Sequence, residues 1–457
     1  MTAEMAEVNE SALTGRPLAP SEAMHLEPTE TVAYAVTVHG PLDVGALTGA
    51  FEASCRVHPV FTGHIRSEGG APELVLPDHR PVPAVQVRVT DGEPAAATRK
   101  LDHTGELIGL EVSRNGDHSA VTLLTDHCIA DARASLALFA EIWGHYTDIV
   151  ETGQPTPLEV QPLPEPLESL LADRGVTRLG RSGVEALFEP APEPHLPDET
   201  GPAAAPTPAA GQVRRRLRFT AETTSALVRL GHADNLSVHG LVSAAVMIAQ
   251  AQAQAHAHAD AQVAAEGSRT REVSVPFMYP VDVRTRISPP VQALAGTNIF
   301  GTVGFKRSVG AHTDPLVLAK ALLDELHESL GDGVVQQSQL HFTGPDPDAP
   351  PPPVQTPAAQ TPVVLAADTT MLTNWGRIPH LRTPEGLTVT DFRGAILDQP
   401  LRPVTGADPA APPAPTSTYI VTTFDGRLGI ELATAHTGTR ADAIIAALDT
   451  TVRRLTT

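Results

Sequence analysis

The spacing of hydrophobic and polar positions changes several times along the chain, and each spacing predicts a type of secondary structure. In the first half, short apolar runs predict strands at residues 31–38, 60–65, 73–76, 85–89, 107–113 and 119–125. Apolar residues at helical spacing predict helices at residues 43–56 and 132–146. Trp143 and Tyr146 belong to the apolar face of the second helix, so we expect both in the core.

The second half of the chain continues this mixture. Strands are expected at residues 213–219, 273–281, 298–305, 363–372, 387–392, 418–424 and 428–434, and helices at 221–232, 238–264, 315–329 and 440–455. Strands and helices do not follow the strict alternation that is typical of a parallel, doubly wound sheet. The sequence therefore predicts an α/β (α+β) protein with two sandwich lobes, each built on a mixed, mostly antiparallel sheet.

Three proline-rich segments interrupt the pattern, at residues 189–210, 344–362 and 400–415. Such segments bury too little apolar surface to offset the entropy of ordering them, so we interpret them as linkers or surface loops. The length of 457 residues is enough for about two or three domains. We expect an N-terminal lobe at 1–188, a linker at 189–210 and a C-terminal lobe at 211–457, which carries the other two segments as insertions.

The composition is that of a globular protein with few large rings in its core. Hydrophobic residues make up 41% of the chain but aromatic residues only 4%. No stretch approaches the roughly 18 consecutive apolar residues that a transmembrane helix needs. Residues 1–10 are acidic, unlike the basic and apolar start of a secretory signal peptide. We therefore expect a cytoplasmic protein without a transmembrane segment.

The formal net charge of −21 argues against nucleic acid as a partner, because phosphate binding needs a basic surface. It also opposes binding of an acidic carrier protein, unless a local basic patch exists. The arginine-rich residues 214–218 are a candidate for such a patch, and an edge strand with solvated arginines explains them equally well. Two cysteines, Cys55 and Cys128, are too few for a disulfide framework, and we expect no metal site.

The spacing His-x-x-x-Asp, a candidate for acid–base chemistry, occurs three times, at His39 and Asp43, His127 and Asp131, and His256 and Asp260. Asp43 follows a turn and precedes a predicted helix, so the role of helix N-cap is sufficient for it. His256 lies in an alternating, low-complexity tract that predicts a solvated helix face, with metal binding by His256 and His258 as a weaker alternative. Only His127 follows a strand-like run and precedes a helix, where a rigid scaffold can aim its imidazole into a cleft.

Cys128, next to His127, offers a different chemistry as a nucleophile. Neighbouring side chains of an extended segment point in opposite directions, so Cys128 is expected to point away from His127. Free cysteines usually behave as small buried hydrophobes. We favour the buried interpretation of Cys128.

Several short blocks, in this order along the chain, resemble one superfamily. They are Leu-Ala-Pro-Ser-Glu at 18–22, His-Cys-Ile-Ala-Asp at 127–131, Tyr-Pro-Val-Asp-Val-Arg at 279–284, Gly-Thr-Asn-Ile-Phe-Gly at 296–301 and Thr-Asn-Trp-Gly-Arg at 373–377. Together they resemble the condensation-domain and chloramphenicol-acetyltransferase-like superfamily. The resemblance is strongest to the polyketide-associated acyltransferases of actinobacteria, typified by phthiocerol dimycocerosyl transferase.

This resemblance implies two chloramphenicol-acetyltransferase-like lobes that form a V around a central channel. It implies that His127 is the general base and that Asp131 is structural, paired with Arg284. The second motif of the family, which shapes the channel and supplies candidate oxyanion donors, corresponds to Asn374, Trp375 and Gly376. Many members have a second histidine and a glycine where this chain has Asp126 and Ala132.

The implied reaction is transfer of a fatty or polyketide acyl group from acyl-CoA or a phosphopantetheinyl carrier protein to a hydroxyl. No cofactor is expected to stay bound. An imidazole with an ordinary pKa of about 6.5 suits removal of the hydroxyl proton at neutral pH. The donor to the tetrahedral oxyanion is left open between Asn374 and the indole N–H of Trp375.

Two other functions agree with the same blocks. One is amide formation by a free-standing condensation-type enzyme, and the other is ligand binding by an inactive relative of the same fold. The absence of an adjoining carrier or adenylation segment favours a free-standing acyltransferase, and the family implies a monomer.

Overall fold

The computed structural model describes residues 14–27, 29–67, 70–76, 82–190, 212–261, 272–310, 312–341, 363–366, 368–397 and 416–457. The chain divides into two compact units, and each combines segments that are distant in the sequence. Unit 1 comprises residues 1–174, 288–299 and 379–399, and unit 2 comprises residues 175–287, 300–378 and 400–457. Residues 189–190 of the predicted linker belong to strand β8 (Phe188–Pro190). The rest of the proline-rich segments, at 191–210, 344–362 and 400–415, lie outside the described residues, so that part of the linker and the two insertions stay predictions.

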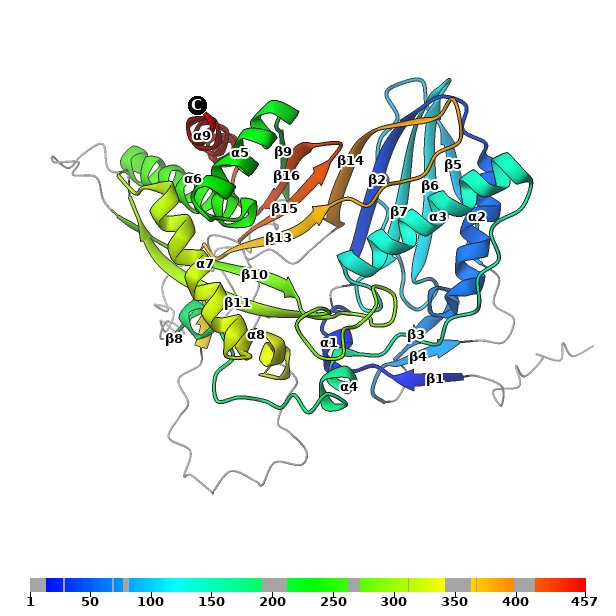
Figure 1. Cartoon of the computed structure of the whole chain (residues 1–457), viewed down its shortest axis with the longest axis horizontal. Coiled ribbons are helices and arrows are strands. Elements are labelled where there is room, and N and C mark those ends of the chain that lie inside the picture. The colour runs from blue at the N-terminus through cyan, green and yellow to red at the C-terminus, as the bar shows by residue number, and fades with distance from the viewer. Residues whose placement is uncertain are drawn as a thin grey trace, which may run out of the picture. The chain divides into compact units, whose positions relative to one another are not determined.

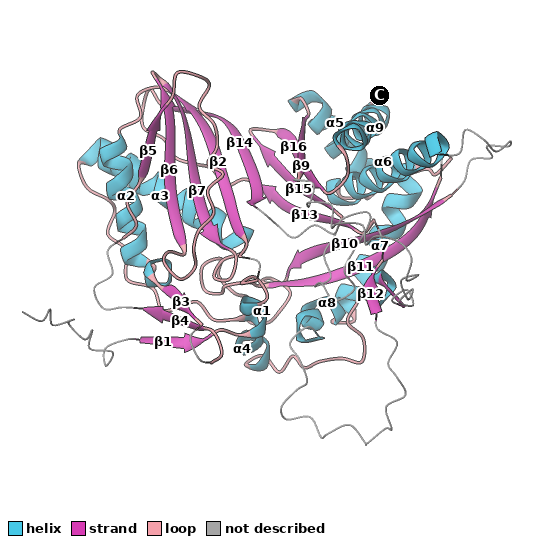
Figure 2. Ribbon diagram, turned by 180° about the vertical axis from the view of Figure 1, so that it is seen from behind, coloured by secondary structure: helices cyan, strands magenta, loops and turns pink. Residues whose placement is uncertain are grey.

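Unit 1 contains a five-stranded sheet in the order β14-β2-β7-β6-β5. Its strands are β2 (Thr31–His39), β5 (Gln86–Val89), β6 (Ile108–Asn115), β7 (His118–Asp126) and β14 (Thr388–Leu397). Strands β5 and β6 pair in parallel, and the other neighbours are antiparallel. Figures 1 and 2 show α2 (Val44–Val57) and α3 (Ala132–Thr152) lying across one face of this sheet.

Helix α3 is fixed against the sheet by its aromatic side chains. Phe139, Trp143 and Tyr146 are fully buried, and their rings meet edge to face at centroid distances of 6.2 and 5.4 Å. The prediction that Trp143 and Tyr146 belong to the core is confirmed. Burial of each such side chain contributes on the order of 2 kcal/mol, so the N-terminus of α3 has a firm position at the end of β7.

Strand β14 joins this sheet from a distant part of the chain. The sequence pattern put residues 387–392 in the C-terminal lobe, whereas β14 pairs antiparallel with β2 in unit 1. Without β14, the outer edge of β2 would present unpaired N–H and C=O groups. Phe392 and Ile396 of β14 are buried in the process. Local spacing predicts the strand but carries no information about its partner.

Unit 1 also contains a three-stranded sheet, β1 (Thr14–Pro17), β4 (Glu73–Leu76) and β3 (His64–Arg66), with the short helices α1 (Pro20–Ala23) and α4 (Leu167–Ala172). The strand predicted at 60–65 is partly wrong, because Pro59–Thr62 forms a 3₁₀ helix, η2, and only β3 is extended. Pro59 presets a helical φ at the first position, which overrides the apolar run that follows.

Unit 2 contains a six-stranded mixed sheet in the order β11-β10-β13-β15-β16-β9. Its strands are β9 (Val213–Arg218), β10 (Val273–Asp282), β11 (Phe300–Val309), β13 (Thr370–Arg377), β15 (Ser417–Phe424) and β16 (Arg427–Thr434). The helices are α5 (Ala221–Ala233), α6 (Val238–Ala261), α7 (Pro315–Gly331), α8 (Val334–Gln337) and α9 (Gly438–Thr456). Helix α6 packs against both α7 and α9.

Smaller elements of unit 2 were not predicted. They are the 3₁₀ helices η3 (Glu185–Leu187) and η4 (Ser338–His341) and the strand β8 (Phe188–Pro190), which pairs with β12 (Val363–Leu365). The strand predicted at 363–372 is divided into β12 and β13, and Asp368 between them has a positive φ of 58°. Residues 262–264 of the predicted long helix lie outside the described residues.

The mixed, mostly antiparallel sheets confirm the predicted fold class. Within the described part of the chain, no helix is by itself long and apolar enough to cross a membrane. The segments that pass such a test only together, Ala221–Ala233 and Val238–Ala255, are bent by 108° at their junction.

Candidate active site

The turn that carries His127 connects strand β7 to helix α3, as the sequence predicts. Asp126 is the last residue of β7, and Asp131 is the N-cap of α3. Asp126 stabilises the turn, because its Oδ1 accepts a hydrogen bond from the backbone N–H of Cys128 at 3.0 Å. His127 is half-buried, whereas Asp126 and Cys128 are fully buried. The imidazole therefore emerges from a turn that a sheet and a helix hold in place.

Asp131 uses both carboxylate oxygens to bind backbone groups. Its Oδ1 accepts the N–H of Ala134 at 3.0 Å, which caps α3, and its Oδ2 accepts the N–H of Ile299 at 3.0 Å. Its own N–H donates to the carbonyl of Thr297 at 3.1 Å. These contacts join the turn to residues 297–299, and they agree with a bracing role for Asp131.

Arg284, the expected partner of Asp131, belongs to unit 2. It is buried, its backbone N–H donates to Oδ1 of Asp282 at 2.9 Å, and its Nη1 lies 3.5 Å from the same oxygen. Because Asp131 belongs to unit 1, its pairing with Arg284 stays a prediction of the family resemblance.

Asn298 determines which nitrogen of His127 carries the proton. The side-chain Nδ2 of Asn298 donates to the backbone carbonyls of His127 and Cys128, at 2.7 and 3.3 Å. These bonds orient the amide so that its Oδ1 faces Nδ1 of His127 at 3.2 Å. An amide oxygen only accepts, so Nδ1 of the neutral ring is the donor and Nε2 keeps its lone pair.

The role of Asn298 was not predicted, although residues 296–301 were among the blocks that carry the resemblance. The available signal was an asparagine in a short polar turn, Gly-Thr-Asn, directly before a strand. That pattern is typical of many turns, so it did not indicate a contact with a residue far away in the sequence.

A second imidazole, His25, lies against His127. The two rings are stacked, with centroids 4.0 Å apart and planes inclined by only 4°. Nδ1 of His25 donates to Oε2 of Glu30 at 2.8 Å, and the backbone carbonyl of Glu30 accepts the N–H of His127 at 2.8 Å. Nothing in the sequence predicted this cluster, because its three members meet through the pairing of β2 with β7.

This environment favours the uncharged form of His127. Burial lowers the pKa of His127 to about 4, and the charge of His25 adds to that effect against the opposing charges of Glu30 and Asp131. Burial alone would raise the pKa of Glu30, but the hydrogen bond and charge of His25, together with His127, lower it below its ordinary value. At neutral pH His127 is therefore uncharged and able to accept a proton.

By residue type, His25, Glu30 and His127 match a metal-ligand set, and their ligand atoms all lie within 4.8 Å of one another. A metal ion binds an imidazole nitrogen in the plane of its ring. Because the two rings are stacked, an ion in the plane of His25 lies outside the plane of His127. The ring geometry therefore opposes a shared metal ion.

Cys128 lacks the environment of a nucleophile. Its side chain is fully buried. Burial raises the pKa of the Cys128 thiol well above its ordinary value, and the charge of Asp126 raises it further. The thiolate is the reactive form, so these facts agree with the interpretation of Cys128 as a small buried hydrophobe.

Asn374, Trp375 and Gly376, the candidates for the channel and the oxyanion donor, lie on β13 in unit 2. The strand has an irregular register between Asn374 and Gly376, where Gly376 adopts a φ of 73°. The side chain of Asn374 contacts Nδ1 of His239 at 3.3 Å and accepts the N–H of Gly376 at 2.9 Å. Trp375 is buried. Their roles as oxyanion donors stay predictions.

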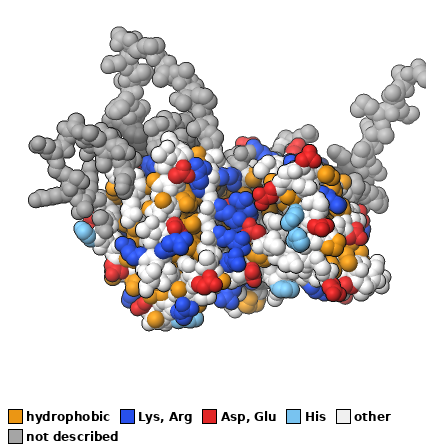
Figure 3. Space-filling view, turned by 90° about the horizontal axis from the view of Figure 1, so that it is seen from above, with side chains coloured by type: hydrophobic (Ala, Val, Ile, Leu, Met, Phe, Trp, Pro, Cys, Tyr) orange, Lys and Arg blue, Asp and Glu red, His pale blue; other side chains and the backbone are white. Residues whose placement is uncertain are grey.

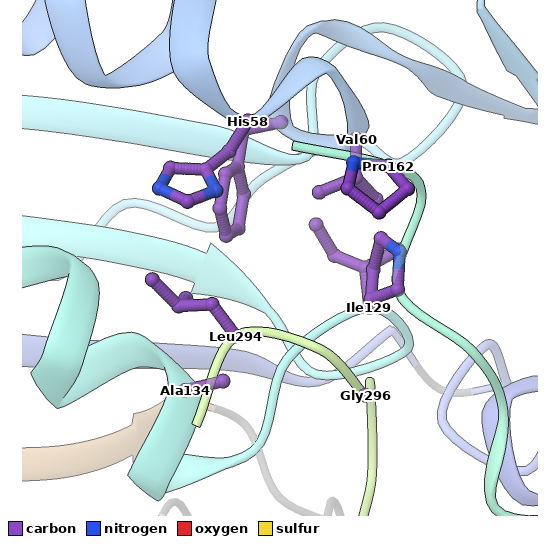
Figure 4. Close-up of a pocket in the computed structure, with 9 residues that line it drawn as sticks. His58, Val60, Ile129, Ala134, Pro162, Leu294 and Gly296 are labelled. Atoms are coloured by element: carbon purple, nitrogen blue, oxygen red, sulfur yellow. The ribbon is translucent and has the colours of Figure 1, made fainter. Parts of the chain in front are cut away.

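A small cavity of unit 1 borders the turn that carries His127 (Figure 4). Ile129 and Ala134 line it from the turn and α3, and Gly296 lines it from the segment before Asn298. The imidazole of His58 also lines this cavity, and its Nε2 is hydrogen-bonded to Oε2 of Glu141 at 2.9 Å. The free space is only about that of one water molecule, so we do not assign this cavity to an acyl chain.

The surface is not uniformly acidic despite the net charge of −21. Figure 3 shows Lys and Arg side chains gathered in a band on one face. The arginine-rich residues 214–218 form β9, which is an edge strand of its sheet, and two of them form ion pairs, Arg215 with Asp442 and Arg216 with Glu431. The interpretation of these residues as an edge strand is confirmed.

Comparisons with known sequences give consistent results. A family model described as the phthiocerol/phthiodiolone dimycocerosyl transferase C-terminus matches residues 208–433. The phthiocerol/phthiodiolone dimycocerosyl transferase of Mycobacterium tuberculosis (strain ATCC 25618 / H37Rv) is 31% identical over 386 residues, which cover 83% of this chain and 85% of that protein. The enzyme of the same name from Mycobacterium leprae (strain TN) is 30% identical over 387 residues, with 83% and 85% covered.

Solved structures agree with the sequence comparisons. Polyketide synthase associated protein 5 from Mycobacterium tuberculosis has a TM-score of 0.70 and 28% identity to this chain, with 96% of this chain and 98% of that one covered. The first condensation domain of the calcium-dependent antibiotic synthetase has a TM-score of 0.59 and 14% identity, with 97% and 96% covered. The predicted chloramphenicol-acetyltransferase-like fold is confirmed.

Proposed function

Because this chain belongs to the phthiocerol/phthiodiolone dimycocerosyl transferase family and is an acyltransferase, we propose that it transfers an acyl group from a thioester to a hydroxyl, with His127 as the general base. Phthiocerol and phthiodiolone appear in the names of its relatives. For this chain we propose the wider class, a fatty or polyketide acyl donor and an alcohol acceptor.

The hydrogen bonds of Asn298 are the observation that carries this proposal. They hold His127 in the tautomer with the proton on Nδ1, so Nε2 is the atom that accepts the hydroxyl proton. The hydroxyl oxygen then attacks the thioester carbonyl carbon, and the carbon–sulfur bond breaks as the tetrahedral intermediate collapses. The proton on Nε2 passes to the leaving sulfur, which returns the imidazole to its neutral form. A positioned base of this kind contributes about 10²–10⁴-fold to the rate.

No covalent acyl-enzyme is part of this proposal, because the neighbouring thiol of Cys128 is buried and protonated. Both substrates must then be bound together, in the channel that the family resemblance implies. We further propose that Asp131 braces the turn with Arg284, and that Asn374 or Trp375 donates to the oxyanion.

The acyl donor is either acyl-CoA or an acyl group on the phosphopantetheine of a carrier protein, with no cofactor retained. A carrier protein is usually acidic, and the basic band in Figure 3 supplies the kind of surface that it would need. A cytoplasmic location and a monomeric state remain predictions from the sequence and the family.

The test uses the wild-type protein and one long-chain acyl group, supplied either as acyl-CoA or on a carrier protein. Each donor is mixed with an alcohol and an amine of the same carbon skeleton, and products are identified by mass spectrometry. We expect ester from the alcohol and at least tenfold less amide from the amine. Amide as the main product would establish the condensation-type alternative, and ligand binding without any product would establish an inactive binding protein.

A further inference from the structure

The stacked pair of His25 and His127 has an asymmetry that the general-base mechanism does not use. Glu30 bonds to His25 at 2.8 Å through Oε2. The Nδ1 of His127 instead faces an uncharged amide oxygen, Oδ1 of Asn298, at 3.2 Å. One ring of the pair is therefore bound to an ionised carboxylate and the other to a neutral acceptor.

Two imidazoles with centroids 4.0 Å apart cannot both carry a positive charge without strong repulsion, since little water separates them. A positive charge on the pair is stabilised best on the ring that contacts a carboxylate. That ring is His25, because Glu30 accepts its Nδ1 proton. The charge on His25 then opposes protonation of His127.

We propose that His25, held by Glu30, is a positioning residue for His127. By stacking against the ring of His127 it keeps that ring oriented, and by its charge it keeps that ring uncharged over the pH range of catalysis. This inference rests on the proposed role of His127 as the base. It assigns functions to two residues, His25 and Glu30, that the sequence motifs do not include.

The groups that face His127 in the described part of unit 1 support this assignment. His25 and Glu30 approach from the segment between α1 and β2, and Asp131 approaches from the N-terminus of α3. His25 opposes a positive charge on His127, while the two carboxylates favour it. Burial raises the pKa of Asp126 in the same turn, and the charges of His103 and His25 oppose that rise. Removing His25 therefore leaves the two carboxylates acting on the charge of His127, and both favour its protonation.

The same stack affects the second half of the reaction. After the hydroxyl proton has moved to Nε2, the imidazolium of His127 lies against a ring that shares a proton with Glu30. While His25 carries a positive charge, repulsion between the two rings makes the imidazolium of His127 a stronger acid, which favours transfer of its proton to the leaving sulfur. Neither His25 nor Glu30 needs to contact substrate for this effect.

The experiment compares the wild type with His25→Phe, which keeps a flat ring against His127 but removes its charge. The protein is labelled with ¹⁵N-histidine, and the ring nitrogens of His127 are titrated by NMR between pH 4 and pH 8. In the wild type we expect the neutral form of His127, with the proton on Nδ1, throughout the upper part of this range. In His25→Phe we expect the midpoint for His127 to rise by at least one pH unit.

Kinetics with the same proteins gives a second measurement. With the midpoint of His127 raised from about 4 by one unit, the transfer rate of His25→Phe should be at least about threefold below that of the wild type near pH 4.5 and should match it near pH 8. His39→Phe is the matched control, because exposed His39 also contacts an imidazole, His118, at a centroid distance of 4.7 Å. We expect His39→Phe to leave both the titration and the pH profile unchanged.

Several results would overturn the inference. One is an unchanged titration midpoint of His127 in His25→Phe. Another is protonation of His127 before His25 in the wild type, and this second result can be obtained even if the variant does not fold. Loss of activity with a chelator and its recovery with zinc alone would show that the cluster binds a metal ion instead. The NMR titration needs no turnover, so failure of the proposed function appears separately, as a wild type that makes no product at any pH.

Discussion

Unit 1 contains two turns with the same spacing and the same local structure but different surroundings. His39 is the last residue of β2, and Asp43 caps α2 by accepting the N–H of Ala46 at 3.0 Å. His127 directly follows β7, and Asp131 caps α3 in the same way. The two strands are antiparallel neighbours, so one sheet presents a strand, histidine and helix-cap arrangement at both of its ends.

The difference between the turns comes from residues 297–299. At the second turn Asp131 also accepts the N–H of Ile299, and Asn298 binds both the ring and the carbonyl of His127. His39 is exposed, and its ring contacts another surface imidazole, that of His118. The spacing therefore reflects how a strand leads into a helix, and a distant segment converts one of the two turns into a candidate site.

Replacing the two histidines one at a time should give the largest difference in activity between the two turns. We expect His127→Ala to reduce transfer by about 10²–10⁴-fold, because the base is lost, while its melting temperature stays near that of the wild type. His39→Ala should retain wild-type activity. A thermal melt beside an assay of thioester consumption measures both, and transfer by His127→Ala at the wild-type rate would refute the role of His127.

The two aspartates should differ in their effects on stability. Asp43→Ala removes a helix cap and should cost about 1 kcal/mol. Asp131→Ala removes a cap and also leaves the buried N–H of Ile299 without its acceptor, so we expect about 2–4 kcal/mol. Urea unfolding monitored by circular dichroism gives both values. Equal losses for the two variants would show that the contact with Ile299 contributes nothing.

Asn298→Ala should affect rate more than stability. The variant removes the hydrogen bond from Nδ1 of His127 to the amide oxygen, and loss of one such hydrogen bond corresponds to about tenfold in kcat. Asn298→Gln, which keeps the amide but moves it, should also be impaired. Steady-state kinetics across pH tests this, and a change confined to KM would assign Asn298 to substrate binding instead.

The last difference between the two turns is in the pH dependence of stability. The pKa of His127 is about 4 in the folded protein and about 6.5 when unfolded, so the unfolded chain binds more protons between these values. His127 therefore lowers the free energy of unfolding as the pH falls through this window, by at most about 1.4 kcal/mol per pH unit. In His127→Gln the slope of unfolding free energy against pH should be shallower than in wild type, and in His39→Gln it should not change.

The sequence predicted the features of the site that depend on neighbouring residues. The end of β7, the start of α3, the cap at Asp43 and the burial of Cys128 follow from local spacing, and the structure confirms all four. These features follow from alternation, helical periodicity and capping, which act over a few residues.

The contacts around His127 could not be predicted in the same way. The stack with His25 depends on how the segment before β2 folds beside the end of β7, and the bond to Asn298 depends on a segment more than a hundred residues further along the chain. A single sequence contains no periodicity that connects such positions. The partner of β14 was missed for the same reason.

The non-contiguous make-up of unit 1 has a consequence for biosynthesis. A ribosome translates β2, β7 and α3 long before residues 288–299, which complete the turn of His127, and β14, which covers the edge of β2. Until both have emerged, the nascent sheet has an open edge of the kind that invites wrong pairings. Contacts over such sequence separations also slow folding. Fragments that stop before residue 397 should therefore require chaperones to stay monomeric, and activity should appear only after most of the polypeptide has been made.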